Sequence, residues 1–393
     1  MSLLIFQSCE NTDEEALGSG DIKSSSFQIT LNETSLKMMA EESDIPDFAI
    51  FNYAATVVSI EYYTEGKDGE TVPVSGALFI PVNNDENYSY TDDALPMLSL
   101  QHGTVFGRND VASVSFMNSR EGLLALISAM GGIVTAVPDY IGFGISQEMH
   151  PYIIEELTAN AVIDFLRAAE DYCADEGIKL NGKLALAGYS EGGFCTMATQ
   201  KAIETKYSDE FNLVYSVPMS GPYDLPAMVD YIFSEDNYAY PSLMSFILTS
   251  YNHYYDWDNL DEIFQSPYNT QVNSLFSGDN GYTVIKEALP DSMHELIKSE
   301  FIDSYLAGNQ TKINDASAEN CLIDNWTPVT PMMLIHGNAD DTVPYLNSVN
   351  AYNKFKDLGA PVTFETVEGG THFSTVIPAL EIAFTKILQE FGK

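Results

Sequence analysis

The stretch from Lys183 to Ala198 constrains the fold of this chain more than any other part of the sequence. An apolar run of strand length ends there in Gly-Tyr-Ser-Glu-Gly, and a helix-prone segment follows at once. A Gly-x-Ser-x-Gly pattern in this setting is typical of a sharp strand-to-helix turn that exposes the serine hydroxyl. Gly188 and Gly192 suit such a turn because a Cβ at either position would collide across it. The pattern therefore makes Ser190 a candidate nucleophile.

The composition excludes several classes of partner. The 393 residues include 17 Lys and Arg against 57 Asp and Glu, which gives a formal net charge of −40. Such a surface repels phosphate backbones and anionic lipid, so we expect no nucleic-acid partner. Hydrophobic residues make up 45% of the chain, which is enough for a packed core.

Strand-like and helix-like segments alternate through much of the chain. Apolar or alternating runs predict strands over 56–64, 71–81, 96–104, 133–140 and 212–219, and amphipathic patterns predict helices over 119–130 and 156–174. Strands that alternate with helices favour an α/β fold with a mostly parallel central sheet and helices on both faces.

Two loops downstream supply the partners that a serine nucleophile needs. An apolar strand leads into His-Gly-Asn-Ala-Asp-Asp-Thr-Val-Pro at 336–344, and a glycine-rich loop at 368–374 holds His372. A serine hydroxyl is too weakly acidic to attack unaided, so a histidine must take its proton and a carboxylate must orient that histidine. The sequence therefore proposes Ser190, Asp340 and His372 as a catalytic triad.

Several motifs together resemble one known family. The chain has Asp-Tyr-Ile-Gly-Phe-Gly at 139–144, His-Pro-Tyr at 150–152 and Gly-Tyr-Ser-Glu-Gly-Gly at 188–193. These blocks resemble the secretory lipases of fungi and the related bacterial LipA-type secreted esterases, which are serine esterases of the α/β-hydrolase superfamily. The order serine, aspartate, histidine along the chain is also that of the superfamily. The resemblance implies an α/β-hydrolase fold with a helical cap insertion, and hydrolysis of carboxylic esters through an acyl-enzyme intermediate.

The resemblance also assigns the acid between two neighbouring aspartates. In the family motif His-Gly-x-x-Asp-x-x-Val-Pro, the aspartate aligns with Asp340, and Asp341 comes one position later. Adjacent side chains in a tight loop generally point in different directions, so we expect only one of the two carboxylates to reach His372.

The remaining site residues are likewise implied by the resemblance. The backbone N–H groups of Thr104 and Glu191 are expected to form the oxyanion hole, since these residues follow a strand end and the nucleophile. Tyr189 and His102 flank these positions and are the candidate substrate-binding residues, with the His102 ring expected to have a structural role.

The organisation of the chain follows from these motifs. We expect residues 1–26 to be a signal or lipoprotein leader with a flexible tether. The hydrolase core is expected in two parts, residues 27–223 and 326–393, and residues 224–325 between them are expected to form a helical cap insertion. The cap segment is rich in Tyr, Phe and Met, so we expect it to line a largely apolar pocket.

The amino terminus resembles the end of a bacterial lipoprotein signal. A short apolar run leads to Cys9, and acidic residues follow it, although no basic segment precedes the run. The interpretation is lipid attachment at Cys9 in an extracellular, cell-surface or periplasmic lipoprotein of a Gram-negative bacterium. In that case the lipid would be the only link to a membrane.

Other functions remain open at this point. The substrate would be a small-molecule, glycan or lipid ester, and no metal or organic cofactor is expected because no metal-ligand or phosphate-loop pattern occurs. The 336–344 motif also occurs in serine peptidases of the dipeptidyl and prolyl type, which is the main alternative. A non-catalytic surface binding protein on the same fold is a third.

Overall fold

The computed structural model describes residues 18–39, 49–235 and 238–393. Within these ranges a nine-stranded sheet runs in the order β1-β2-β3-β5-β4-β6-β7-β8-β9. Its strands are β1 (Ile22–Leu31), β2 (Ala54–Glu65), β3 (Thr71–Val82), β4 (Leu95–Gln101), β5 (Val134–Pro138), β6 (Leu180–Tyr189), β7 (Leu213–Met219), β8 (Met332–Gly337) and β9 (Val362–Val367). The pairings among β1, β2, β3 and β5 are antiparallel, and those from β5 through β4 and β6 to β9 are parallel. The predicted fold class, an α/β-hydrolase with a mostly parallel sheet, is confirmed.

Helices cover both faces of the sheet because the strands are apolar on both sides. In β6, Leu184 and Leu186 pack into one core with α4 and α5, while Ala185 and Ala187 pack into a second core with α3 and α15. The helices outside the cap are α1 (Glu33–Met39), α2 (Ala112–Ser115), α3 (Arg120–Met130), α4 (Glu155–Asp175), α5 (Glu191–Lys206), α14 (Leu346–Asp357) and α15 (Val376–Phe391), with short 3-10 turns at Lys67–Gly69 and Phe116–Asn118.

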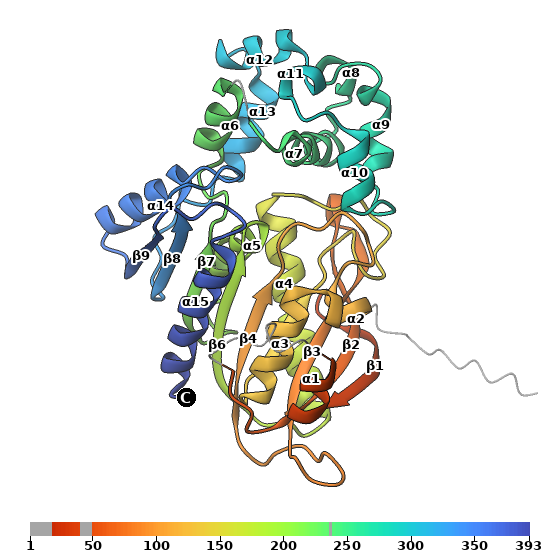
Figure 1. The fold of residues 1–393 in the computed structure, drawn as a ribbon, viewed down its shortest axis with the longest axis vertical. Helices are drawn as coiled ribbons and strands as arrows, with labels where there is room; N and C mark the ends of the chain where they lie inside the picture. Colours follow the sequence, from red (N-terminus) through yellow and green to blue (C-terminus); the bar gives the residue numbers. More distant parts are fainter. Residues whose placement is uncertain (1–17, 40–48, 236–237) are drawn as a thin grey trace, which may run out of the picture.

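A group of helices between β7 and β8 lies above the carboxyl ends of the parallel strands (Figure 1). We call this group the cap. Its helices are α6 (Leu225–Ser234), α7 (Pro241–Tyr254), α8 (Leu260–Ile263), α9 (Tyr268–Leu275), α10 (Tyr282–Ala288), α11 (Met293–Leu296), α12 (Ser299–Leu306) and α13 (Thr311–Glu319). Because the carboxyl edge is where open α/β sheets bind ligands, this position makes the cap a wall of the site.

One sequence expectation was wrong at the start of the sheet. A flexible leader was expected to extend to residue 26, but β1 already begins at Ile22 and pairs with β2 from Ile22 to Leu31. The strand was missed because its first half is polar and exposed, so the sequence lacks the alternation of a half-buried strand. Cys9 lies outside the described residues. Within the described ranges, no helix combines the length and apolar character that crossing a membrane requires.

Candidate active site

Ser190 occupies a strained turn between β6 and α5. Its backbone has φ 62° and ψ −121°, in the left-handed half of conformational space that most residues avoid. Neighbouring backbone groups hold this conformation: the Ser190 N–H donates to the Met219 carbonyl at 2.9 Å, and its carbonyl accepts from the N–H of Gly193 at 2.9 Å. A Cβ at Gly192 would collide with the Gln101 carbonyl at the end of β4, so the glycine lets the start of α5 approach the end of β4.

The side chains of Ser190, His372 and Asp340 form one continuous hydrogen-bonded series. His372 Nε2 lies 2.8 Å from Ser190 Oγ, and His372 Nδ1 lies 2.7 Å from Asp340 Oδ2. His372 comes from the loop between β9 and α15, and Asp340 from the loop after β8. In this geometry the imidazole can accept the hydroxyl proton on one nitrogen while the carboxylate fixes the tautomer on the other.

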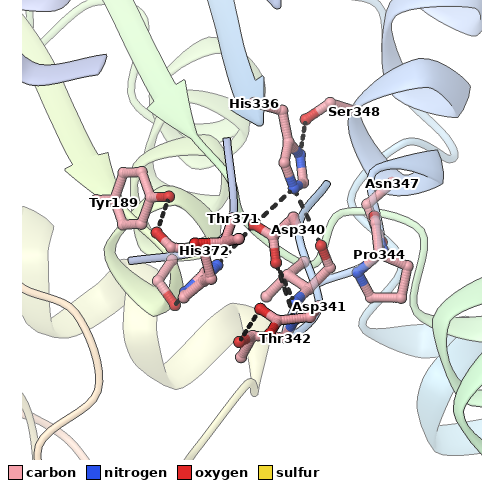
Figure 2. A network of polar contacts seen from close by, with 12 residues as sticks. Tyr189, His336, Asp340, Asp341, Thr342, Pro344, Asn347, Ser348, Thr371 and His372 are labelled. Atoms are coloured by element: carbon pink, nitrogen blue, oxygen red, sulfur yellow. Dashed lines mark hydrogen bonds and ion pairs between the residues drawn. The ribbon is translucent and has the colours of Figure 1, made fainter. Parts of the chain in front are cut away.

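Asp340 is held by the loop that carries it, residues 338–344, which we call the acid loop. The backbone N–H groups of Thr342 and Val343 each donate to Asp340 Oδ1 at 2.9 Å. His336 Nε2 lies 3.1 Å from Asp340 Oδ2 (Figure 2). Burial favours the neutral carboxyl group, but the hydrogen bonds from His336 and His372 outweigh it and hold the pKa of Asp340 well below its ordinary value. Asp340 is therefore a carboxylate in the folded protein.

His336, the first residue of the 336–344 motif, is also held by definite partners. Its Nε2 also lies 3.0 Å from the Val343 carbonyl, which can only accept, so Nε2 carries a proton. Nδ1 then accepts from the Ser348 hydroxyl at 2.8 Å. Asp340 thus accepts hydrogen bonds from two histidines. Asp341 is exposed, and its carboxylate contacts the Thr342 hydroxyl at 3.5 Å rather than His372.

Comparison with known proteins identifies the family. The family model for secretory lipases matches residues 117–392, well over half of the chain. The chain belongs to the secretory lipase family. A search of curated protein sequences found no significant match.

Solved structures agree with this membership. The rice cell wall degrading esterase LipA from Xanthomonas oryzae is 26% identical with a TM-score of 0.82, over 95% of this chain and 98% of that chain. A candidate hydrolase of Legionella pneumophila is 25% identical with a TM-score of 0.85, over 94% and 98%. Candida antarctica lipase A in its closed state shares the fold, at 14% identity and a TM-score of 0.71 over 96% and 83%. This secretory lipase is therefore a carboxylic-ester hydrolase.

Both residues proposed for the oxyanion hole are held through their side chains by the His-Pro-Tyr block. Thr104 Oγ1 lies 2.8 Å from the Tyr152 hydroxyl, and Glu191 Oε1 lies 2.6 Å from His150 Nε2. The Gly103–Thr104 backbone passes close to Ser190, since a Cβ on Gly103 would lie 3.9 Å from the Ser190 Cβ. Sequence spacing could not predict these two contacts, because the partners are joined only by tertiary packing.

Tyr189 and His102 have their polar atoms engaged by backbone. The Tyr189 hydroxyl donates to the His372 carbonyl at 2.6 Å (Figure 2). His102 Nδ1 lies 2.8 Å from the Gly103 carbonyl and Nε2 lies 3.1 Å from that of Asp139. The two side chains therefore help to place the loops of the site, and their role in substrate binding stays a prediction.

Two cavities border Ser190. The main cavity has a volume of about 520 Å³ and lies between the cap, the loop after β4 and His372. The small cavity has a volume of about 20 Å³ and lies between α6, α7 and the acid loop. In agreement with the largely apolar pocket that the sequence predicted, the wall of the main cavity is more apolar than polar, with Phe106, Leu243 and Leu289 at its border. Charged side chains, among them Arg120 and Lys286, also border it.

Proposed function

We propose that this secretory lipase is a serine esterase in which Ser190 is the nucleophile, His372 the general base and Asp340 the orienting acid. The observation that carries the proposal is the unbroken series of short contacts from Asp340 through His372 to Ser190. The low pKa of Asp340 supports it, because only the carboxylate can stabilise an imidazolium.

The reaction follows from the geometry in two steps. His372 accepts the Ser190 proton as Oγ bonds to the ester carbonyl carbon, and then gives that proton to the alcohol oxygen as the ester C–O bond breaks. Water then attacks the acyl-enzyme, with His372 again acting as base and then acid, and releases the carboxylic acid and free Ser190. The Thr104 and Glu191 backbone N–H groups would bind the oxyanion, each contributing about 3 kcal/mol to transition-state stabilisation.

Active-site labelling tests this assignment directly. A fluorophosphonate should modify Ser190 stoichiometrically, and peptide mass spectrometry should locate the adduct on the 184–200 segment. Labelling should be absent after heat denaturation, because the nucleophile depends on His372. Hydrolysis of p-nitrophenyl esters should exceed that of aminoacyl-nitroanilides, and the reverse preference would favour a peptidase.

The Tyr152 hydroxyl is expected to position the proposed oxyanion donor Thr104. Tyr152→Phe removes one neutral hydrogen bond to Thr104 Oγ1, so we expect kcat to fall about threefold to tenfold with little change in KM. The matched control is Tyr251→Phe, which removes a buried hydroxyl that donates to the Ile153 carbonyl at 3.0 Å in the same segment. Equal kcat losses in the two variants would argue against a specific role for Tyr152.

We further propose that the mature protein is a lipoprotein carrying lipid on Cys9, exported by a Gram-negative bacterium. The apolar run before Cys9 and the acidic residues after it support this. Mass spectrometry of the amino-terminal peptide from the native host should find diacylglyceryl or triacyl cysteine. Cys9→Ser should release the enzyme from the membrane fraction with its specific activity unchanged. An intact peptide retaining Met1 would count against the proposal.

A further inference from the structure

The small cavity is bordered mainly by apolar side chains, many of them from the cap and the acid loop. Its apolar border includes residues of α6 and α7 and one residue of the acid loop: Met228, Ile232, Met244, Ile247 and Val343. All five side chains are buried. Tyr238 also borders the small cavity, and its hydroxyl donates to the Thr342 carbonyl at 2.9 Å, so this polar atom is already satisfied.

The two cavities differ in their access to His372. His372 and Phe373 border the main cavity, whereas the small cavity is bordered by Ser190 and Glu191 without His372. The departing alcohol oxygen must receive its proton from His372 Nε2, so the alcohol portion has to lie in the main cavity. The acyl portion stays bonded to Ser190 and needs no contact with the imidazole. The small cavity is the remaining space beside the acyl carbon.

We propose that the small cavity is the acyl subsite, and that it selects acetyl-sized acyl groups on esters of larger alcohols. This inference rests on the proposed function of Ser190. A volume of about 20 Å³ is only slightly more than a cavity needs to hold one water molecule, which leaves room for a group of about methyl size. The volume of about 520 Å³ in the main cavity leaves room for a much larger alcohol.

The packing of the walls makes the limit on acyl length a sharp one. Met244 is 0% exposed and Ile232 is 1% exposed, so each additional methylene would have to displace a packed side chain. Forcing extra methylenes into a closely packed space reduces stability of the complex, which here lowers the rate by roughly tenfold or more. Both residues belong to the cap, so the cap sets the acyl limit.

A p-nitrophenyl series tests the proposal, because its alcohol portion stays constant while the acyl chain grows. For the full chain, kcat/KM should fall about tenfold from acetate to butyrate and further to octanoate. Ile232→Ala, or Met228→Ala as a second enlarging variant, should raise the butyrate-to-acetate ratio about tenfold. Leu289 borders the main cavity and not the small one, so Leu289→Ala should leave the butyrate-to-acetate ratio within about twofold of wild type.

The outcomes separate this inference from the proposed function. A wild-type optimum at octanoate with Ser190-dependent turnover would overturn the acyl subsite and leave the esterase proposal intact. The acyl subsite would also be overturned if the butyrate-to-acetate ratio were unchanged in both enlarged variants while circular dichroism showed that each variant folds. Absence of both turnover and fluorophosphonate labelling would remove the esterase proposal itself, and the subsite with it.

Discussion

Replacing Ser190 with alanine is expected to lower kcat for ester hydrolysis by a factor on the order of 10⁵ to 10⁶. The substitution removes the hydroxyl that lies 2.8 Å from His372 Nε2, so the imidazole loses the proton that it would accept. Turnover of p-nitrophenyl acetate and labelling by a fluorophosphonate measure the loss. Labelling should disappear completely, because the reagent forms its bond to the serine oxygen.

The backbone strain at position 190 makes a folding control necessary. Alanine has the same Cβ as serine, so the φ of 62° costs the variant no more than the wild type, and the thermal unfolding midpoint should be nearly unchanged. Ser216→Ala is a matched control, since this serine is fully buried in β7 and its hydroxyl has no hydrogen-bond partner in the described structure. That variant should keep wild-type turnover. Substantial hydrolysis by the Ser190 variant would show that another residue is the nucleophile.

Asp340→Asn is expected to reduce kcat by a factor of about 10⁴. An asparagine amide keeps the shape of the side chain, but His372 Nδ1 and His336 Nε2 both contact Asp340 Oδ2, so an NH₂ group at that position would face both histidines. The His372 tautomer that carries its proton on Nδ1 and leaves Nε2 free would then lose the acceptor of its Nδ1–H group. In the flipped orientation the NH₂ group would instead face the N–H groups of Thr342 and Val343. Steady-state kinetics at constant pH measure the effect.

The neighbouring aspartate supplies the control for that experiment. Asp341→Asn changes an exposed side chain whose carboxylate does not reach His372, so kcat should stay within about twofold of wild type. If Asp341→Asn caused the larger loss, the assignment of the acid to Asp340 would be wrong.

Local sequence patterns predicted the elements whose signal is contained in a few residues. The β6–turn–α5 unit could be predicted because an apolar run, two glycines and a serine occur within one short stretch. The strands β2 and β3 were predicted from apolar or alternating runs. In contrast, β1 is an edge strand whose residues 23–27 are exposed, so backbone pairing with β2 forms it without an apolar pattern.

Contacts between distant segments could not be predicted in this way. The Glu191–His150 pair joins residues 41 positions apart, and both side chains are buried. Sequence motifs marked both residues, but the contact depends on how the loop after β5 folds back over α5. The division of the space around Ser190 into two cavities depends on how the cap helices pack, which a pattern of aromatic residues leaves undetermined.

The acid loop limits how this enzyme can diverge. Thr342 and Val343 bind Asp340 through their backbone and also border the small cavity. Substitutions at Thr342 or Val343 would alter both the border of the small cavity and the position of the Asp340 carboxylate, since a change in loop conformation moves that carboxylate. Met228 and Ile232 border the small cavity from α6 and lie outside the acid loop. Natural variants with altered acyl preference should therefore accumulate their substitutions on α6 and α7, and directed evolution of chain-length preference should begin with libraries at these helices.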